Sequence, residues 1–360
     1  MTAPRLEVDL DQIEHNARTL VERLAKRGVS VTGVTKAVLG SPEIARAFLR
    51  AGVSGIGDSR LENIESMRRA GVAATMTLIR SPMLSQTDRV VASADVSFNT
   101  ELCVVESLSK AAERTGRDHG VVLMVELGDL REGIMPGDLE DAVGQTILLP
   151  GIRLMGIGTN LACRSGVSPD SGNMAELSSL ASAIEAKFGI TVDVVSGGNS
   201  ANLNWALSGA DVGRVNNLRL GEAILLGREP LYRQAIDGLF TDAIKLVAEV
   251  IESKAKPSLP WGKIGQTAFG ESGSHVDRGP VRQSILAVGI QDTDPEGLTP
   301  PLGTQIVGAS SDHLILESEA GSLSLNVGDE VALQPNYGAL LRSMTSPFVG
   351  SHFAGRVQRD

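Results

Sequence analysis

Lys36 is the last residue of a short β-branched run, residues 31–36, and it is a candidate for carbonyl chemistry. Such a run is typical of a buried parallel strand. Ser41 and Pro42, just beyond it, are typical of an N-cap and a first helical position. Lys36 should therefore lie at the carboxyl end of a strand, where α/β proteins bind ligands and where burial favours a reactive free amine. On this run alone, a solvated lysine is the simpler interpretation.

Two later strand ends carry groups that could act with this lysine. Gly198, Asn199 and Ser200 follow an apolar strand and open a predicted helix. The glycine allows close approach of an anion, and the helix N-terminus supplies N–H donors, so the turn is a candidate phosphate site. Such turns are common, and the motif alone is weak. Arg219 follows the next predicted strand, where it could face the same site or simply pair with Glu222.

A third polar group lies in residues 128–133, after the strand predicted at 121–127. Asp129, Arg131 and Glu132 alternate in charge between two glycines. They could clamp an amino acid or only solvate a loop. A lysine, a phosphate-binding turn and an arginine, each after a different strand, together indicate a pyridoxal-phosphate site.

The elements that must position these groups alternate between strand and helix patterns. Strands are predicted at residues 6–10, 31–36, 53–57, 75–79, 95–98, 121–127, 152–159, 192–195 and 211–215. Helices are predicted at residues 11–26, 42–51, 59–70, 100–114, 138–148, 170–188 and 200–207. From residue 31 onward this gives eight βα units, which favours a closed (β/α)8 barrel of the TIM type. A doubly wound open sheet is the alternative.

The pattern changes after about Gly238. Short alternating stretches then follow one another between prolines and glycines, at residues 243–251, 282–290, 305–307, 314–316 and 330–333. This texture predicts strands rather than helices. We therefore expect an α/β barrel domain over residues 1–238 and a β-rich C-terminal domain over residues 239–360.

Composition narrows the class of protein. A net charge of −10 and a pI near 5.1 argue against nucleic acid or an anionic membrane as partner. Two cysteines, Cys103 and Cys163, do not make a disulfide framework. No apolar run has membrane length, so a cytoplasmic protein is expected. No metal site is expected either.

Taken in order, the motifs resemble the alanine racemase-like (fold type III) family of pyridoxal-phosphate enzymes, and in particular its ornithine racemase branch. The resemblance extends over nearly the whole chain. It rests on residues 6–10, 15–16, 34–37, 51–53, 158–160, 199–201, 219–221, 308–313 and 336–337. The ornithine racemase branch is favoured by residues 128–133, 270–271, 277–279 and 310–313.

The resemblance implies pyridoxal 5′-phosphate as cofactor. It places on that cofactor Lys36, Asn160, Gly198, Asn199, Ser200, Arg219 and Tyr337. Lys36 would hold the cofactor and take or return the substrate's Cα proton on one face. Arg219 stays protonated, so it would donate to the ring nitrogen and keep that nitrogen unprotonated. The weaker electron sink that results favours racemisation over transamination or elimination.

The chain departs from the family at two places. Phe269 occupies the place of the tyrosine that alanine racemases use as second base, and residues 124–126 lack the lysine that would be carbamylated. Racemisation needs a proton carrier on the opposite face. His313 and Asp312 are the first candidates, followed by His275, although His313 could also be a plain loop histidine.

We therefore predict a pyridoxal-phosphate amino-acid racemase for a basic amino acid, with ornithine first and lysine or alanine next. The resemblance implies a homodimer in which the loop at residues 308–313 reaches the partner's site. Substrate contacts are expected from Asp129, Arg131, Glu222 and Ser311. A D-amino-acid lyase or decarboxylase of the same fold, and a non-catalytic cofactor-binding protein, are the alternatives. Arg219 argues against a decarboxylase, the lack of an evident Cys/His zinc pair against such a lyase, and the long β domain against a non-catalytic protein.

Overall fold

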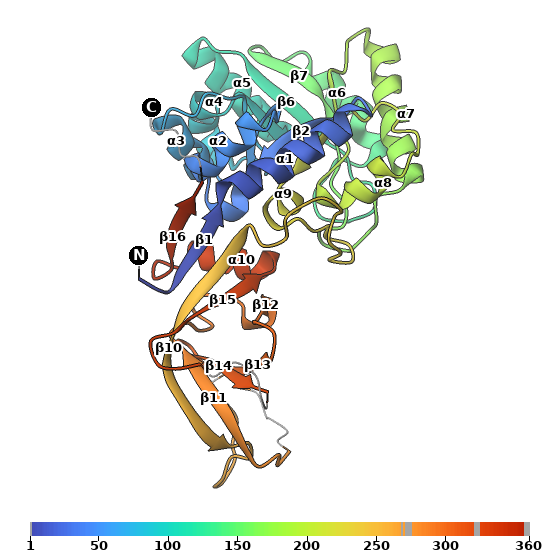
Figure 1. Ribbon diagram of the computed structural model, residues 1–360. Helices are drawn as coiled ribbons and strands as arrows, with labels where there is room; N and C mark the ends of the chain where they lie inside the picture. The colour runs from blue at the N-terminus through green and yellow to red at the C-terminus, as the bar shows by residue number, and fades with distance from the viewer. Residues whose placement is uncertain (1, 268, 271–275, 320–324, 356–360) are drawn as a thin grey trace. The chain divides into compact units, whose positions relative to one another are not determined.

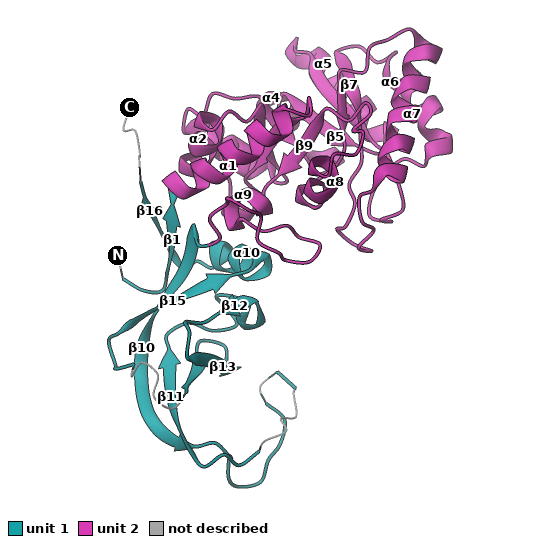
Figure 2. Ribbon diagram, turned by 45° about the vertical axis from the view of Figure 1, so that its right-hand side comes forward, with its two compact units in different colours: residues 1–9, 242–355 teal, residues 10–241, 356–360 magenta. Residues whose placement is uncertain are grey.

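The structure is a computed structural model that describes residues 2–267, 269–270, 276–319 and 325–355. The chain divides by its internal contacts into two compact units (Figure 2). Leu10–Thr241 form the barrel unit, and Met1–Asp9 with Asp242–Gly355 form the β unit. The expected division at residue 238 lies close to this one. The first nine residues nevertheless group with the β unit, because their strand pairs within it.

The barrel unit is a closed ring of eight parallel strands (Figure 1). In chain order the strands are β2 (Ser30–Val34), β3 (Gly55–Asp58), β4 (Met76–Leu78), β5 (Val96–Asn99), β6 (His119–Met124), β7 (Ile152–Gly158), β8 (Val194–Ser196) and β9 (Asn217–Leu220). The ring closes where β9 pairs with β2, with Ser30 opposite Asn217 and Thr32 opposite Arg219. The expected (β/α)8 barrel is confirmed, and the open sheet is excluded by this closure.

Helices follow the strands along the chain and cover the barrel. They are α1 (Leu10–Ala25), α2 (Pro42–Arg50), α3 (Leu61–Arg69), α4 (Thr87–Ser93), α5 (Leu102–Thr115), α6 (Leu139–Thr146), α7 (Ser171–Phe188), α8 (Leu203–Leu207) and α9 (Glu222–Leu226). In α1 the predicted apolar stripe is buried, and it comprises Ile13, Ala17, Leu20 and Leu24. Helices α4 and α9 were not predicted, because seven and five residues give at most two turns of periodicity. No helix in the described ranges has both the length and the apolar character that crossing a membrane requires.

The eighth strand does not lie where it was expected. Residues 211–215 form a turn, in which the Gly213 amide donates to Asp211 (2.9 Å) and the Val215 amide to Val212 (3.0 Å). The strand itself is Asn217–Leu220. Arg219 therefore lies within a strand instead of after one, and it is only 5% exposed.

The β unit is a mostly antiparallel sheet in the order β12, β15, β10, β11, β14, β13, to which β1 and β16 are attached. Its elements are β1 (Arg5–Asp9), β10 (Ile244–Pro257), β11 (Pro280–Leu286), β12 (Leu298–Thr299), β13 (Thr304–Ala309), β14 (Leu314–Ser318), β15 (Glu330–Pro335), α10 (Tyr337–Thr345) and β16 (Gly350–Ala354). Strand β1 pairs with both β10 and β16. The expected β-rich second domain is confirmed, with β1, β12, β16 and the helix α10 as additions.

Candidate active site

Lys36 begins a tight turn at the carboxyl end of β2. The Thr35 amide donates to the Gly57 carbonyl (3.0 Å), and a 3-10 turn, η1 (Lys36–Val38), follows. Gly40 ends this turn at φ 63°, where a Cβ would lie 2.7 Å from the Cβ of Asn63. Ser41 then caps α2 by accepting from the Ile44 amide (3.4 Å), with Pro42 as first helical residue. The predicted strand end and helix start around Lys36 are confirmed.

The Lys36 amine has an unusual environment. Burial lowers its pKa from the ordinary lysine value, and the positive charges of Arg131 and Arg219 lower the pKa further. The charges of Cys163 and Asp58 oppose the shift without cancelling it. Lys36 is therefore more readily a neutral amine than a surface lysine is, as a nucleophile or general base requires.

Asp58 supports the residue before Lys36 and was missed by the sequence analysis. It is fully buried at the end of β3, and its Oδ2 accepts from the Thr35 hydroxyl (2.8 Å). Its Oδ1 accepts from the amide of Arg60 (2.9 Å) and the side chain of Asn63 (3.0 Å). Burial raises the pKa of Asp58 in spite of these hydrogen bonds. The carboxyl group joins the ends of β2 and β3 and so fixes the turn that carries the lysine.

Arg219 is held inside the barrel by uncharged acceptors. Its Nη1 donates to Ser196 Oγ (2.6 Å), and its Nη2 donates to the Thr159 carbonyl (2.7 Å) and to Asn160 Oδ1 (3.3 Å). The guanidinium carbon lies 5.0 Å from the centre of the Phe98 ring, a cation–π distance. Burial, with the charge of Arg131, lowers the pKa of Arg219 to about 9. The alternative that Arg219 pairs with Glu222 is wrong.

The Gly198–Ser200 turn follows β8 and contacts α9, the helix that follows β9. Gly198 has φ 144°, and a Cβ there would lie 2.1 Å from Asn202 Oδ1. Asn199 caps the 3-10 turn η4 (Ser200–Asn202), because its side chain accepts from the Ala201 amide (2.8 Å). The Ser200 hydroxyl accepts from the Ala223 amide in α9 (3.2 Å). The turn and the start of α9 are thereby brought together.

Asn160 connects this turn to Arg219. Its Oδ1 accepts both from Arg219 and from Asn199 Nδ2 (3.1 Å). Its Nδ2 is buried and has no hydrogen-bond partner in the described part of the chain. A buried donor without a partner is costly, so this position suits a bound group that supplies an acceptor. The arrangement of Lys36, Asn160, Ser200 and Arg219 fits a ligand that carries an aldehyde, acceptor atoms and an anionic end, as pyridoxal phosphate does.

Arg131 lies beside a cysteine. Its guanidinium pairs with Glu132 and donates to Cys163 Sγ (2.7 Å). Burial opposes its charge, but Glu132 and Cys163 outweigh burial and raise the pKa of Arg131. Because Cys163 and Arg131 both act on Lys36 electrostatically, these three groups face one region. Cys163 was not among the predicted site residues, because it lies 32 residues from Arg131 in the sequence.

Asp129 binds loop backbone. It is fully buried, and its carboxylate accepts from the amides of Cys163 (3.2 Å), Arg164 (2.8 Å) and Ser165 (3.1 Å). Burial alone would raise the pKa of Asp129, but these hydrogen bonds prevail and lower it. Asp129 therefore joins the loop after β6 to the loop after β7. A substrate contact by Asp129 stays a prediction.

Glu222 is paired with another arginine. At the start of α9 it forms an ion pair with Arg233. Burial raises the pKa of Glu222, while Arg233 and the charge of Lys36 act in the opposite direction. The Glu222 side chain is 13% exposed, and its electrostatic interaction with Lys36 places it on the same side of the barrel.

The remaining predicted site residues lie in the β unit. Ser311, Asp312 and His313 form the turn between β13 and β14, with His313 Nδ1 2.9 Å from Asp312 Oδ1. Tyr337 is the first residue of α10. Phe269 is 48% exposed, and His275 lies outside the described residues. Among the residues that the structure describes, no group of three or more His, Cys, Asp or Glu side chains could hold a metal ion.

Comparison with known proteins identifies the family. The family described as alanine racemase, N-terminal domain, matches residues 8–229. The chain belongs to the alanine racemase family. It is similar to the ornithine racemase of Acetoanaerobium sticklandii, with 37% identity over 349 residues that cover 96% of this chain and 98% of that protein. The lysine racemase of Thermotoga maritima is also 37% identical, over 352 residues that cover 97% and 98%.

A solved structure in the family has the same fold. The alanine racemase from Bartonella henselae with covalently bound pyridoxal phosphate superposes with a TM-score of 0.74 at 17% identity, over 98% of this chain and 100% of that one. The predicted family is confirmed by these matches. So is the combination of a barrel with a β-rich domain.

Proposed function

We propose that this alanine racemase family member is a pyridoxal-phosphate racemase of a basic amino acid, with ornithine as first candidate. The observation that carries the proposal is a buried arginine whose acceptors are uncharged, beside a lysine whose pKa is lowered. The ornithine and lysine racemases that match nearly the whole chain support a basic substrate. A decarboxylase or lyase lacks this support.

The residues of the barrel unit fit pyridoxal 5′-phosphate. When bound, the cofactor supplies an electron sink that makes the substrate's Cα–H acidic. Lys36 would hold it and move a proton to or from Cα on one face. Arg219 would donate to the ring nitrogen, and the unpartnered Nδ2 of Asn160 to a further acceptor. Gly198, Asn199 and Ser200 would hold the phosphate, with Tyr337 of the β unit.

Substrate recognition requires a carboxylate partner and an ammonium partner. Arg131 is the candidate for the carboxylate. Glu222 is a stronger candidate than Asp129 for the side-chain ammonium of ornithine. The Asp129 oxygens already accept three backbone amides, whereas Glu222 pairs with an arginine that is 60% exposed. Ser311 would complete the substrate contacts.

The opposite face of Cα needs its own proton carrier. We assign this role to His313, oriented by Asp312, whose carboxylate lies 2.9 Å from the imidazole. This loop would serve the active site of the second subunit in a homodimer. A cytoplasmic location is part of the same proposal.

Deuterium exchange at Cα tests the function directly. The enzyme with cofactor would be incubated in D2O with a panel of L- and D-amino acids. We expect exchange and inversion of ornithine, with lysine and alanine slower. Borohydride reduction followed by peptide mapping should attach the cofactor to Lys36. Release of CO2 or of an aldehyde without inversion would instead indicate a decarboxylase or lyase.

A further inference from the structure

A chain of hydrogen bonds extends from Arg219 through the interior of the barrel. The Ser196 hydroxyl, which accepts from Arg219 Nη1 (2.6 Å), is 2.8 Å from Asn217 Oδ1. The Asn217 amide nitrogen is in turn 3.1 Å from Thr32 Oγ1 and 3.2 Å from Ser30 Oγ. These residues lie on three neighbouring strands, because β8 and β2 both pair with β9.

Ser30, at the end of this series farthest from Arg219, determines which group donates in each of these hydrogen bonds. Ser30 donates its single hydroxyl proton to the Asn216 carbonyl (2.8 Å), so towards Asn217 it can only accept. Asn217 must therefore present its NH2 group to Ser30, which leaves its oxygen facing Ser196. An amide oxygen cannot donate. Ser196 consequently donates to Asn217 and presents a lone pair to Arg219.

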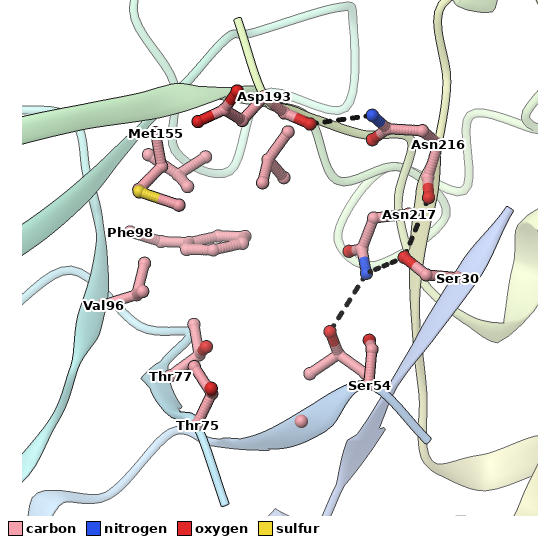
Figure 3. Close-up of a pocket in the computed structure, with 14 residues that line it drawn as sticks. Ser30, Ser54, Thr75, Thr77, Val96, Phe98, Met155, Asp193, Asn216 and Asn217 are labelled. Atoms are coloured by element: carbon pink, nitrogen blue, oxygen red, sulfur yellow. Dashed lines mark hydrogen bonds between the residues drawn. The ribbon is translucent and has the colours of Figure 1, made fainter. Parts of the chain in front are cut away.

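The end of the hydrogen-bond series that is farthest from Arg219 lies beside a cavity of about 310 Å³ (Figure 3). Ser30, Thr32 and Asn217 line this cavity together with Phe98, whose ring also contacts Arg219. The cavity is at the amino ends of the strands, the end opposite Lys36. Thr77, also part of its wall, makes no hydrogen bond through its side chain to the residues the structure describes, so it offers a matched control.

These hydrogen bonds orient the Arg219 guanidinium without neutralising its positive charge. A carboxylate in place of Ser196 would also hold the guanidinium, but its negative charge would weaken the effect of Arg219 on the cofactor's ring nitrogen. Ser196 is fully buried and uncharged, and the other two acceptors, the Thr159 carbonyl and Asn160 Oδ1, are uncharged as well. The full positive charge therefore stays available to disfavour protonation of that nitrogen.

We propose that Ser196 and Asn217 are positioning residues for Arg219. Their hydrogen bonds, each with a determined donor, favour racemisation over transamination. The proposal rests on the proposed function, because the ring nitrogen belongs to the cofactor. Neither residue touches substrate. They act by fixing the direction in which the Arg219 guanidinium donates.

Three variants of the full-length enzyme with cofactor test the proposal. Ser196→Ala removes one acceptor of Arg219. Thr32→Val removes one acceptor of Asn217 with little change in the size of the Thr32 side chain. Thr77→Val makes the same substitution on β4, another strand that lines the cavity. Two readouts are the ratio of keto acid formed to ornithine racemised, and the 15N chemical shift of 15N-labelled cofactor. The shift reports the state of the ring nitrogen and does not depend on turnover.

For Ser196→Ala we expect about a tenfold loss of racemisation kcat, the lower bound for one hydrogen bond to a charged group. We also expect a KM within about twofold, a higher keto-acid ratio and a 15N signal displaced towards the protonated form. Thr32→Val should shift both readouts in the same direction by a smaller factor, and Thr77→Val should shift neither. If Ser196→Ala does not fold, Thr32→Val against Thr77→Val decides.

The proposal is overturned if Ser196→Ala and Thr32→Val retain the wild-type 15N signal and keto-acid ratio, or if Thr77→Val changes them equally. A wild-type enzyme that binds the cofactor but racemises no amino acid would refute the proposed function. The 15N comparison would still test the hydrogen-bond chain.

Discussion

Asp129→Asn separates a loop-binding role of Asp129 from a substrate-binding role. The carboxylate accepts three backbone amides, two closest to Oδ2 (Cys163 and Arg164) and one to Oδ1 (Ser165). Whichever oxygen becomes NH2, at least one buried amide loses its acceptor, which costs about 1–3 kcal/mol, and the others lose a charged acceptor. We expect the free energy of unfolding to fall by about 2–4 kcal/mol.

The pH dependence of this loss has a definite sign. Hydrogen bonds keep the pKa of Asp129 below its ordinary value in the folded protein. Its contribution is therefore fully present above the unfolded pKa of about 3.9, and it is lost as the pH falls through the lower, folded pKa. The difference between variant and wild type should be constant from about pH 6 to 8 and should shrink in strong acid.

Thermal and denaturant unfolding measure the stability, and KM values for ornithine and alanine measure the effect on substrate. A loosened loop should raise both KM values by a similar factor, because Arg131 is displaced for either substrate. Asp138→Asn is the control, since Asp138 is exposed and its side chain does not cap α6. Unchanged stability with a KM raised only for ornithine would refute the loop role and favour a direct substrate contact.

Three further predictions concern the chemistry. Arg219→Glu should slow racemisation and increase keto-acid formation, because a carboxylate accepts a hydrogen bond from the protonated ring nitrogen and stabilises that form; wild-type rates without keto acid would refute this. In a mixture of inactive Lys36→Ala and His313→Ala subunits, heterodimers should recover activity if the His313 loop serves the partner's site, and no recovery in verified heterodimers would place the loop elsewhere. N-ethylmaleimide should inactivate the enzyme through Cys163, which contacts Arg131 and acts on Lys36; Cys163→Ser should resist, whereas Cys103→Ser, which removes the other exposed cysteine, should not.

Local patterns were sufficient for the parts of the site that neighbouring residues determine. The run before Lys36, with Ser41 and Pro42 after it, predicted a strand end and a helix start within a dozen residues. The spacing of Ile13, Ala17 and Leu20 likewise predicted the buried face of α1. Propensity, capping and periodicity act over this range, and the sequence contains all three.

Local patterns did not predict the position of the strand that carries Arg219. Residues 211–215 and 217–220 are both short and partly apolar, and a strand buried in a barrel has no alternation to distinguish them. Closure of the ring, in which Asn217 pairs with Ser30 and Ser196, decided between the two segments.

The acceptors of Arg219 and the partners of Asp129 were likewise decided by tertiary structure. They come from the ends of other strands and from loops more than thirty residues away, except for Ser196, which is 23 residues away. The sequence by itself indicated that Lys36 and the Gly198–Ser200 turn each follow a barrel strand. It placed Arg219 after a strand as well, whereas the structure has Arg219 within β9. Which uncharged groups hold the arginine depended on the register of eight strands around a closed ring, because a side chain's contacts across a barrel are determined only once every pairing in the ring is made.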